Sequence, residues 1–119
     1  MENTKWHSIH YIKDNIWKIT FHNKCTTVSL NTFFLEYKQF LLEKKAKIII
    51  VFDITKLESI SMNQVTLIIT FLNSMKSCHK THLDSFELLL SNIFFINLAD
   101  VIFSITPPVV PYKIIKSFT

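Results

Sequence analysis

Residues 47–60 read Lys-Ile-Ile-Ile-Val-Phe-Asp-Ile-Thr-Lys-Leu-Glu-Ser-Ile, and this stretch decides the fold class. Its first half is an apolar run, 48–54, interrupted only by Asp53. β-branched and aromatic residues favour strands, and an unbroken run of them is typical of a central strand buried on both faces. We therefore expect such a strand here, with Asp53 near its carboxyl end and a connection from Thr55 to Ser61.

A hairpin and a helix are predicted before this strand. Residues 16–22 alternate between bulky apolar and polar side chains, which is the period of a half-buried strand. The segment from Lys5 to Lys13 is its expected partner, joined by a turn at Asp14-Asn15. An amphipathic helix should follow, with Ser29 or Asn31 near its start. Its apolar residues recur at spacings of three and four: Leu30, Phe33, Phe34, Tyr37 and Leu41.

Helix and strand patterns alternate after the central strand. Helical spacing resumes after Ser61 or Asn63, either of which is a suitable N-cap. The chain continues with a buried strand over 86–90 and a helix capped by Ser91-Asn92. We expect a last strand over 109–115 at a sheet edge, because the backbone of Pro111 cannot donate a hydrogen bond to a neighbouring strand. This order predicts an α/β fold with a mixed sheet of about five strands and helices mainly on one face, in a single domain over 1–119.

The composition excludes several classes of function. The chain has no glycine, so neither of the glycine-rich phosphate-binding loops can be built. Backbone positions with positive φ must then fall on residues such as Asp14-Asn15, Asn23 and Asn92. The net charge of +4 comes without an aromatic-interleaved basic motif, so we expect no nucleic-acid partner. We also expect no cofactor.

The two cysteines, Cys25 and Cys78, indicate reduced thiols rather than a disulfide framework. The stretch Cys78-His79-Lys80-Thr81-His82 has potential metal ligands but lacks the second spaced pair of a structural zinc site, so no metal is expected. No apolar run reaches the length of a membrane span, and residues 1–5 are polar. We therefore expect a cytoplasmic protein.

The order of elements resembles the STAS fold of bacterial anti-sigma-factor antagonists. The segment from Ile9 to Ile19 resembles the opening hairpin of that family, and residues 48–60 resemble its characteristic strand and the loop that leads into the switch helix. The resemblance implies a protein that regulates by binding a protein partner and is not an enzyme. It also implies that the partner docks on the loop and on the start of the following helix.

The loop departs from the family pattern. Where family members carry Asp-Ser-Ser/Thr-Gly, with a hydroxyl that a partner kinase phosphorylates, this chain has Ser61-Met62-Asn63-Gln64. The acceptor position falls on Asn63, whose amide cannot be phosphorylated in that way, and Gln64 stands in place of the glycine. A shifted alignment would put Ser61 or Ser59 in the acceptor role. We therefore expect the phosphorylation switch to be lost.

The resemblance and the residue patterns together lead to three candidate functions. The first is a non-catalytic regulatory module that docks a protein partner, with these expected contact residues: Asp53, Ser59, Ser61, Asn63 and Gln64. The second is a domain that binds a small anionic ligand or nucleotide at the same helix N-terminus, where backbone N–H groups are unpaired. The third, a divergent enzyme, requires a pocket with ionisable groups around Asp53.

The segment Ile93-Phe94-Phe95-Ile96 carries more apolar surface than one helix face can bury. One interpretation is a core helix covered on both sides. The other is an exposed apolar patch that mediates assembly, most simply of a homodimer. The sequence alone does not decide between them.

Overall fold

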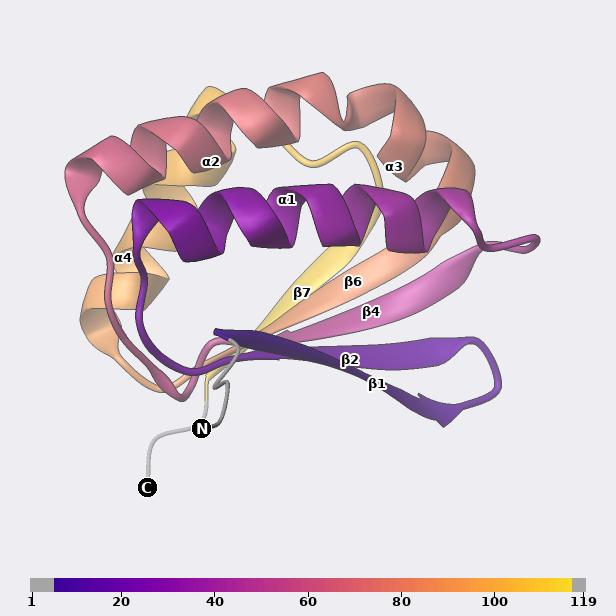
Figure 1. Ribbon diagram of the computed structural model, residues 1–119, viewed down its shortest axis with the longest axis horizontal. Coiled ribbons are helices and arrows are strands. Elements are labelled where there is room, and N and C mark those ends of the chain that lie inside the picture. Colours follow the sequence, from indigo (N-terminus) through magenta and orange to yellow (C-terminus); the bar gives the residue numbers. More distant parts are fainter. Residues whose placement is uncertain (1–5, 117–119) are drawn as a thin grey trace.

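Five strands form the main sheet, in the order β1–β2–β4–β6–β7 (Figure 1). The computed structural model describes residues 6–116. The strands are β1 (His7–Lys13), β2 (Ile16–Phe21), β4 (Ile48–Asp53), β6 (Leu83–Leu90) and β7 (Tyr112–Lys116). β1 and β2 pair antiparallel as a hairpin, and every later pair is parallel. The predicted mixed sheet of about five strands is confirmed, with β7 at an edge.

The helices of the described chain lie on one face of this sheet (Figure 1). They are α1 (Thr27–Leu42), α2 (Met62–Ser74), α3 (Lys76–His82) and α4 (Ile93–Ile105). β3 (Asn23–Lys24) and β5 (Leu57–Ser59) form a second, short parallel sheet between the strand ends and the helix starts. No helix among residues 6–116 has both the length and the apolar character needed to cross a bilayer.

The central strand β4 is covered on one side only. Ile48 and Ile50 point toward the helices and are buried, and Ile50 is 0% exposed. Ile49 and Val51 point the other way and are partly exposed. The prediction of burial on both faces is therefore wrong, because among the described residues no helix covers the second face. A run of β-branched residues does not distinguish these two situations.

Polar caps set the helix starts. The Thr26 hydroxyl accepts a hydrogen bond from the backbone N–H of Ser29, and the Ser29 hydroxyl accepts one from the backbone N–H of Thr26. The helix α1 therefore begins at Thr27, earlier than the predicted start near Ser29 or Asn31. Ser61 and Asn92 are N-caps as predicted. Asn92 has φ −126° in that role, so the prediction of a positive φ there is wrong.

Positive φ occurs at Asp14 (50°) and Asn23 (62°), as the absence of glycine requires. Other differences concern element bounds. The predicted connection 55–61 contains β5. β6 begins at Leu83, before the predicted 86, and the predicted start of β1 at Lys5 lies outside the described residues.

The fully buried Ile50 should carry much of the fold's stability. Ile50→Ala removes side-chain atoms from the centre of the helix-covered face, so the free energy of unfolding should fall by about 2–5 kcal/mol in urea denaturation. Leu35→Ala on α1, where the side chain is 75% exposed, is the matched control and should change it by less than about 0.5 kcal/mol. Equal losses for the two variants would contradict the assigned core.

Candidate functional site

The segment that joins β5 to α2 is held by a closed set of hydrogen bonds. The Ser61 N–H donates to Gln64 Oε1 at 2.8 Å, and the Gln64 N–H donates to Ser61 Oγ at 3.2 Å. Gln64 Nε2 also donates to the carbonyl oxygen of Cys25, 3.0 Å away at the entrance to α1. Gln64 is buried, so the side chain of this predicted site residue does not face solvent. It instead ties the segment to the start of α1.

The outer side of the same segment faces solvent. Ser59, Ser61 and Asn63 are exposed, and the Met62 side chain is 70% exposed although it is apolar. The backbone N–H of Cys25 donates to the carbonyl of Ser59 at 3.1 Å, so the segment runs beside the start of α1. The chain therefore presents a fixed, exposed turn that combines polar residues with one large apolar side chain.

Asp53 lies apart from this turn, because it points to the face of the sheet that the helices leave open. Its Oδ1 accepts the Thr55 backbone N–H at 2.9 Å and the Thr55 hydroxyl at 2.5 Å. Its Oδ2 lies 3.5 Å from Lys18 Nζ. Burial alone would raise the pKa of this carboxyl, but the hydrogen bonds from Thr55 and the charge of Lys18 hold it below the ordinary value.

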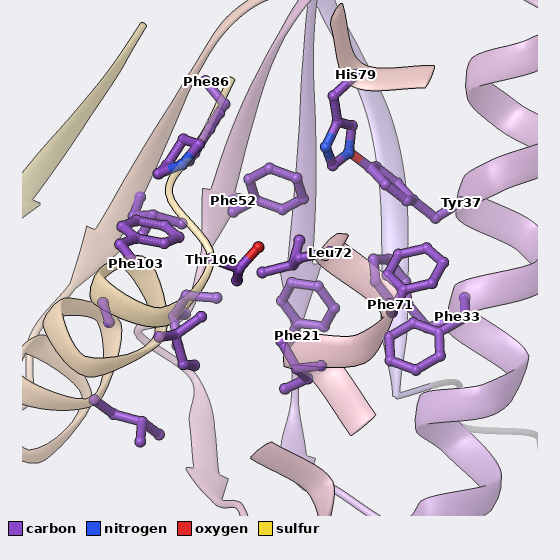
Figure 2. Close-up of a pocket in the computed structure, with 18 of the residues that line it drawn as sticks. Phe21, Phe33, Tyr37, Phe52, Phe71, Leu72, His79, Phe86, Phe103 and Thr106 are labelled. Atoms are coloured by element: carbon purple, nitrogen blue, oxygen red, sulfur yellow. The ribbon is translucent and has the colours of Figure 1, made fainter. Parts of the chain in front are cut away.

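A cavity of about 220 Å³, partly open to solvent, lies on the other side of the sheet, between its helix-covered face and the helices. Figure 2 shows the rings of Phe21, Phe52 and Phe103 around this space, with Leu72 of α2 above the sheet. Its wall is almost entirely apolar. Asp53 does not line it, so this cavity is not the pocket around Asp53 that the enzyme hypothesis requires.

Two polar residues form a hydrogen-bonded pair in the cavity wall. Tyr37 Oη of α1 lies 2.7 Å from His79 Nε2 of α3 (Figure 2). Burial lowers the pKa of His79 to about 4, and burial, with a smaller contribution from Cys78, raises the pKa of Tyr37. Both groups are therefore neutral at pH 7, and together they can present a donor or an acceptor to the cavity.

The wall also contains Thr106, whose side chain is 4% exposed. Figure 2 shows its hydroxyl pointing into the cavity. Within residues 6–116 this hydroxyl has no hydrogen-bond partner, and its oxygen is open to the cavity and not sealed in the protein. The indole N–H of Trp6, another wall residue, is fully buried and has no partner in the described part of the chain.

The cysteines are poor nucleophiles in this environment. Burial raises the pKa of Cys25 to about 11 and also raises that of Cys78. Both thiols are free. Among the residues that the structure describes, no three His, Cys, Asp or Glu side chains are grouped closely enough to hold a metal ion.

The fold is similar to that of a solved bacterial protein. This is an uncharacterized protein of the DUF3478 family from Shewanella loihica PV-4, described as having a SpoIIAA-like fold. The two align with a TM-score of 0.59 and 15% sequence identity, over 96% of this chain and 90% of that one. Neither a comparison with protein-family models nor one with curated proteins finds a match.

The likeness confirms the predicted SpoIIAA-like, or STAS, fold. At 15% identity it concerns the fold and not the activity. Of the predicted site residues, the structure joins Ser61 with Gln64 and sets Ser59 beside the start of α1, while Asp53 stands on the opposite face. The cavity was not predicted from the sequence, because its wall residues have the same apolar periodicity as an ordinary core.

The contribution of the Asp53 carboxylate to stability should depend on pH. Because its pKa in the folded state is lowered, the carboxylate stabilises the fold above its unfolded pKa of about 3.9, and this contribution is lost as the pH falls through the folded value. Asp53→Asn should cost about 1–3 kcal/mol of unfolding free energy at pH 7, and less below about pH 4.

Chemical denaturation of both proteins at several pH values measures this difference. Asp84→Asn, at an exposed position of β6, is the control and should change stability little at any pH. A cost for Asp53→Asn that is the same at pH 7 and at pH 3 would show that the charge of Asp53 is not what stabilises the fold.

Proposed function

We propose that this domain is a non-catalytic regulatory module that binds a protein partner through the exposed side of residues 59–63, here called the docking turn. The observation that carries the proposal is the exposure of Met62 on a backbone that hydrogen bonds hold fixed. A backbone that is already fixed does not have to be ordered when a partner binds, so this part of the entropy cost is avoided.

The surroundings of the docking turn support a protein partner. Val28, in the first turn of α1, is 77% exposed and follows the Cys25 backbone that is bonded to Ser59. Figure 1 shows α1, α2 and α4 beginning at the same end of the sheet, where the parallel strands end. Exposed apolar residues next to polar ones are typical of protein contact surfaces.

The fold likeness supports the regulatory part of the proposal. The structural neighbour has a SpoIIAA-like fold, and the expectation of a regulatory binding module comes from resemblance to that class. A phosphorylation switch is not part of the proposal. Asn63 has no hydroxyl, and the Ser61 hydroxyl already caps α2 by accepting the backbone N–H of Gln64.

The anionic-ligand alternative has less support at this helix N-terminus. The capping box between Ser61 and Gln64 already occupies the Gln64 N–H, which an anion would otherwise use. The non-catalytic part of the proposal is supported by the role of Asp53, whose oxygens are engaged by Thr55 and Lys18. We also propose a cytoplasmic location, from the free thiols.

The docking turn can be tested by affinity capture from cells of the source organism with quantitative mass spectrometry. The double variant Met62→Lys, Asn63→Lys should reduce capture of the specific partner by roughly tenfold or more, because it places two charges in an apolar contact. Leu35→Lys, at an equally exposed apolar position of α1, should leave capture unchanged. Capture of that partner by the double variant at the wild-type level would rule out the turn as the contact.

Self-association is proposed at a second surface. In α4, Phe95 and Ile96 are buried, whereas Ile93 is 64% and Phe94 53% exposed, so one segment supplies both the core and an apolar patch. We expect sedimentation velocity to show a concentration-dependent dimer that Phe94→Asp abolishes. Thr70→Asp, at an exposed position of α2, should not affect it. A wild-type protein that stays monomeric over the full concentration range would end the dimer proposal.

A further inference from the structure

Helix α2 does not pack down on the sheet along its length. Its buried residues, Gln64 and Val65, are both in its first turns. Further along, Ile68, Phe71 and Leu72 are partly exposed and line the cavity. A helix that covers a sheet normally buries its apolar stripe completely, so the open space beneath α2 replaces the expected contact.

The sheet opposite α2 has the complementary feature. Phe52 of β4 and Phe86 and Leu88 of β6 lie on the helix-covered face of two central strands, yet they are partly exposed and line the cavity. The space of about 220 Å³ exceeds the roughly 150 Å³ of an apolar protein cavity that binds benzene. The cavity is therefore large enough for an apolar ligand larger than benzene.

The polar groups of the wall include a cation. Lys76 and His79 are three residues apart on α3, which puts both on one helix face, and both line the cavity. Among residues 6–116, no acidic side chain lines the cavity and Lys76 forms no ion pair. Within residues 6–116, Lys76 is therefore the one charged side chain among the residues that line the cavity, and no neighbouring carboxylate neutralises it.

A second observation independently indicates a ligand. The Thr106 side chain is more than nine-tenths buried, and its hydroxyl points into the cavity without a partner in the described chain (Figure 2). The hydroxyl oxygen is open to the cavity and is therefore available to a polar group placed there. A ligand with a polar end would bond to this hydroxyl and would also meet the neutral Tyr37–His79 pair.

We propose that the cavity binds a small amphiphilic carboxylic acid. Its apolar body, an acyl chain or an aryl group, fills the space between Phe52, Phe71 and Phe103, and its carboxylate is directed toward Lys76. Thr106 and the Tyr37–His79 pair are the neutral hydrogen-bonding groups of the same wall. This site is separate from the docking turn, and the proposal does not depend on the protein-binding proposal.

Two probes separate the apolar part of the recognition from the charged part: decanoic acid and its neutral analogue decanol. Isothermal titration calorimetry with the full chain should show one molecule of decanoate bound per chain, and saturating decanoate should raise the melting temperature. Lys76→Gln should weaken decanoate binding by roughly tenfold and leave decanol binding unchanged. Lys80→Gln, on the same helix but exposed and outside the cavity, is the matched control and should change neither.

The location is tested by filling the cavity. Ala99→Leu on α4 adds volume to the wall and should abolish binding of both probes without lowering the melting temperature, because the added side chain enters open space. Ala46→Leu, at an exposed position, should bind both probes normally. Leu72→Trp on α2 is the second filling variant if Ala99→Leu does not fold.

The outcomes decide the proposal. Absence of saturable binding of both probes to the wild-type chain would overturn the cavity as a ligand site. Unchanged binding in a folded cavity-filling variant would overturn its location. Binding of decanoate that Lys76→Gln does not weaken relative to decanol would overturn the carboxylate as the recognised group.

Discussion

The packing of helices on one face of the sheet constrains every other feature of this domain. Ile48 and Ile50 of β4 are buried beneath the helices, while Ile49 and Val51 on the other face remain partly exposed. Because the strands from β2 onward are parallel, α2 and α4 begin at the carboxyl ends of those strands (Figure 1). The short β3–β5 sheet brings the start of α1 to the same end of the molecule. The docking turn is a consequence of this arrangement.

The two faces of the sheet consequently have different chemistry. On the open face, Asp53 and Lys18 form a charged pair that the hydrogen bonds of Thr55 complete. On the covered face, α1 packs closely through Phe33, Tyr37 and Leu41, while the middle of α2 stands off from the strands. Each square ångström of apolar wall left uncovered forgoes about 25 cal/mol of burial free energy, which a ligand of matching shape would recover.

The sequence predicted the architecture well, because the signals involved are local. The alternation of residues 16–22, the apolar run 48–54 and the caps at Ser61 and Asn92 each depend on neighbouring residues, and their order was sufficient to predict the SpoIIAA-like fold. Burial was harder to predict: the same β-branched run suits a strand covered on one face or on both. The start of α1 was missed because Thr26 caps it through Ser29, a pairing that spacing alone does not single out.

The candidate sites were predicted less completely, and for a physical reason. The role of Gln64 depends on the carbonyl of Cys25, thirty-nine residues away, and the pairing of Tyr37 with His79 spans forty-two residues. Such contacts arise only when the helices are in place. The cavity is the extreme case, since a residue such as Phe71 has the same spacing along α2 whether it packs against the sheet or faces an open space.

The central claim is that α2 stands off from the sheet and leaves room for an apolar guest. A crystal structure of the protein under xenon pressure tests this most directly, because xenon enters dry apolar cavities and is easily located. The account predicts a xenon atom between Phe52, Leu72 and Phe103. The account would be contradicted by a structure in which that space contains no xenon and Leu72 packs directly against Phe52.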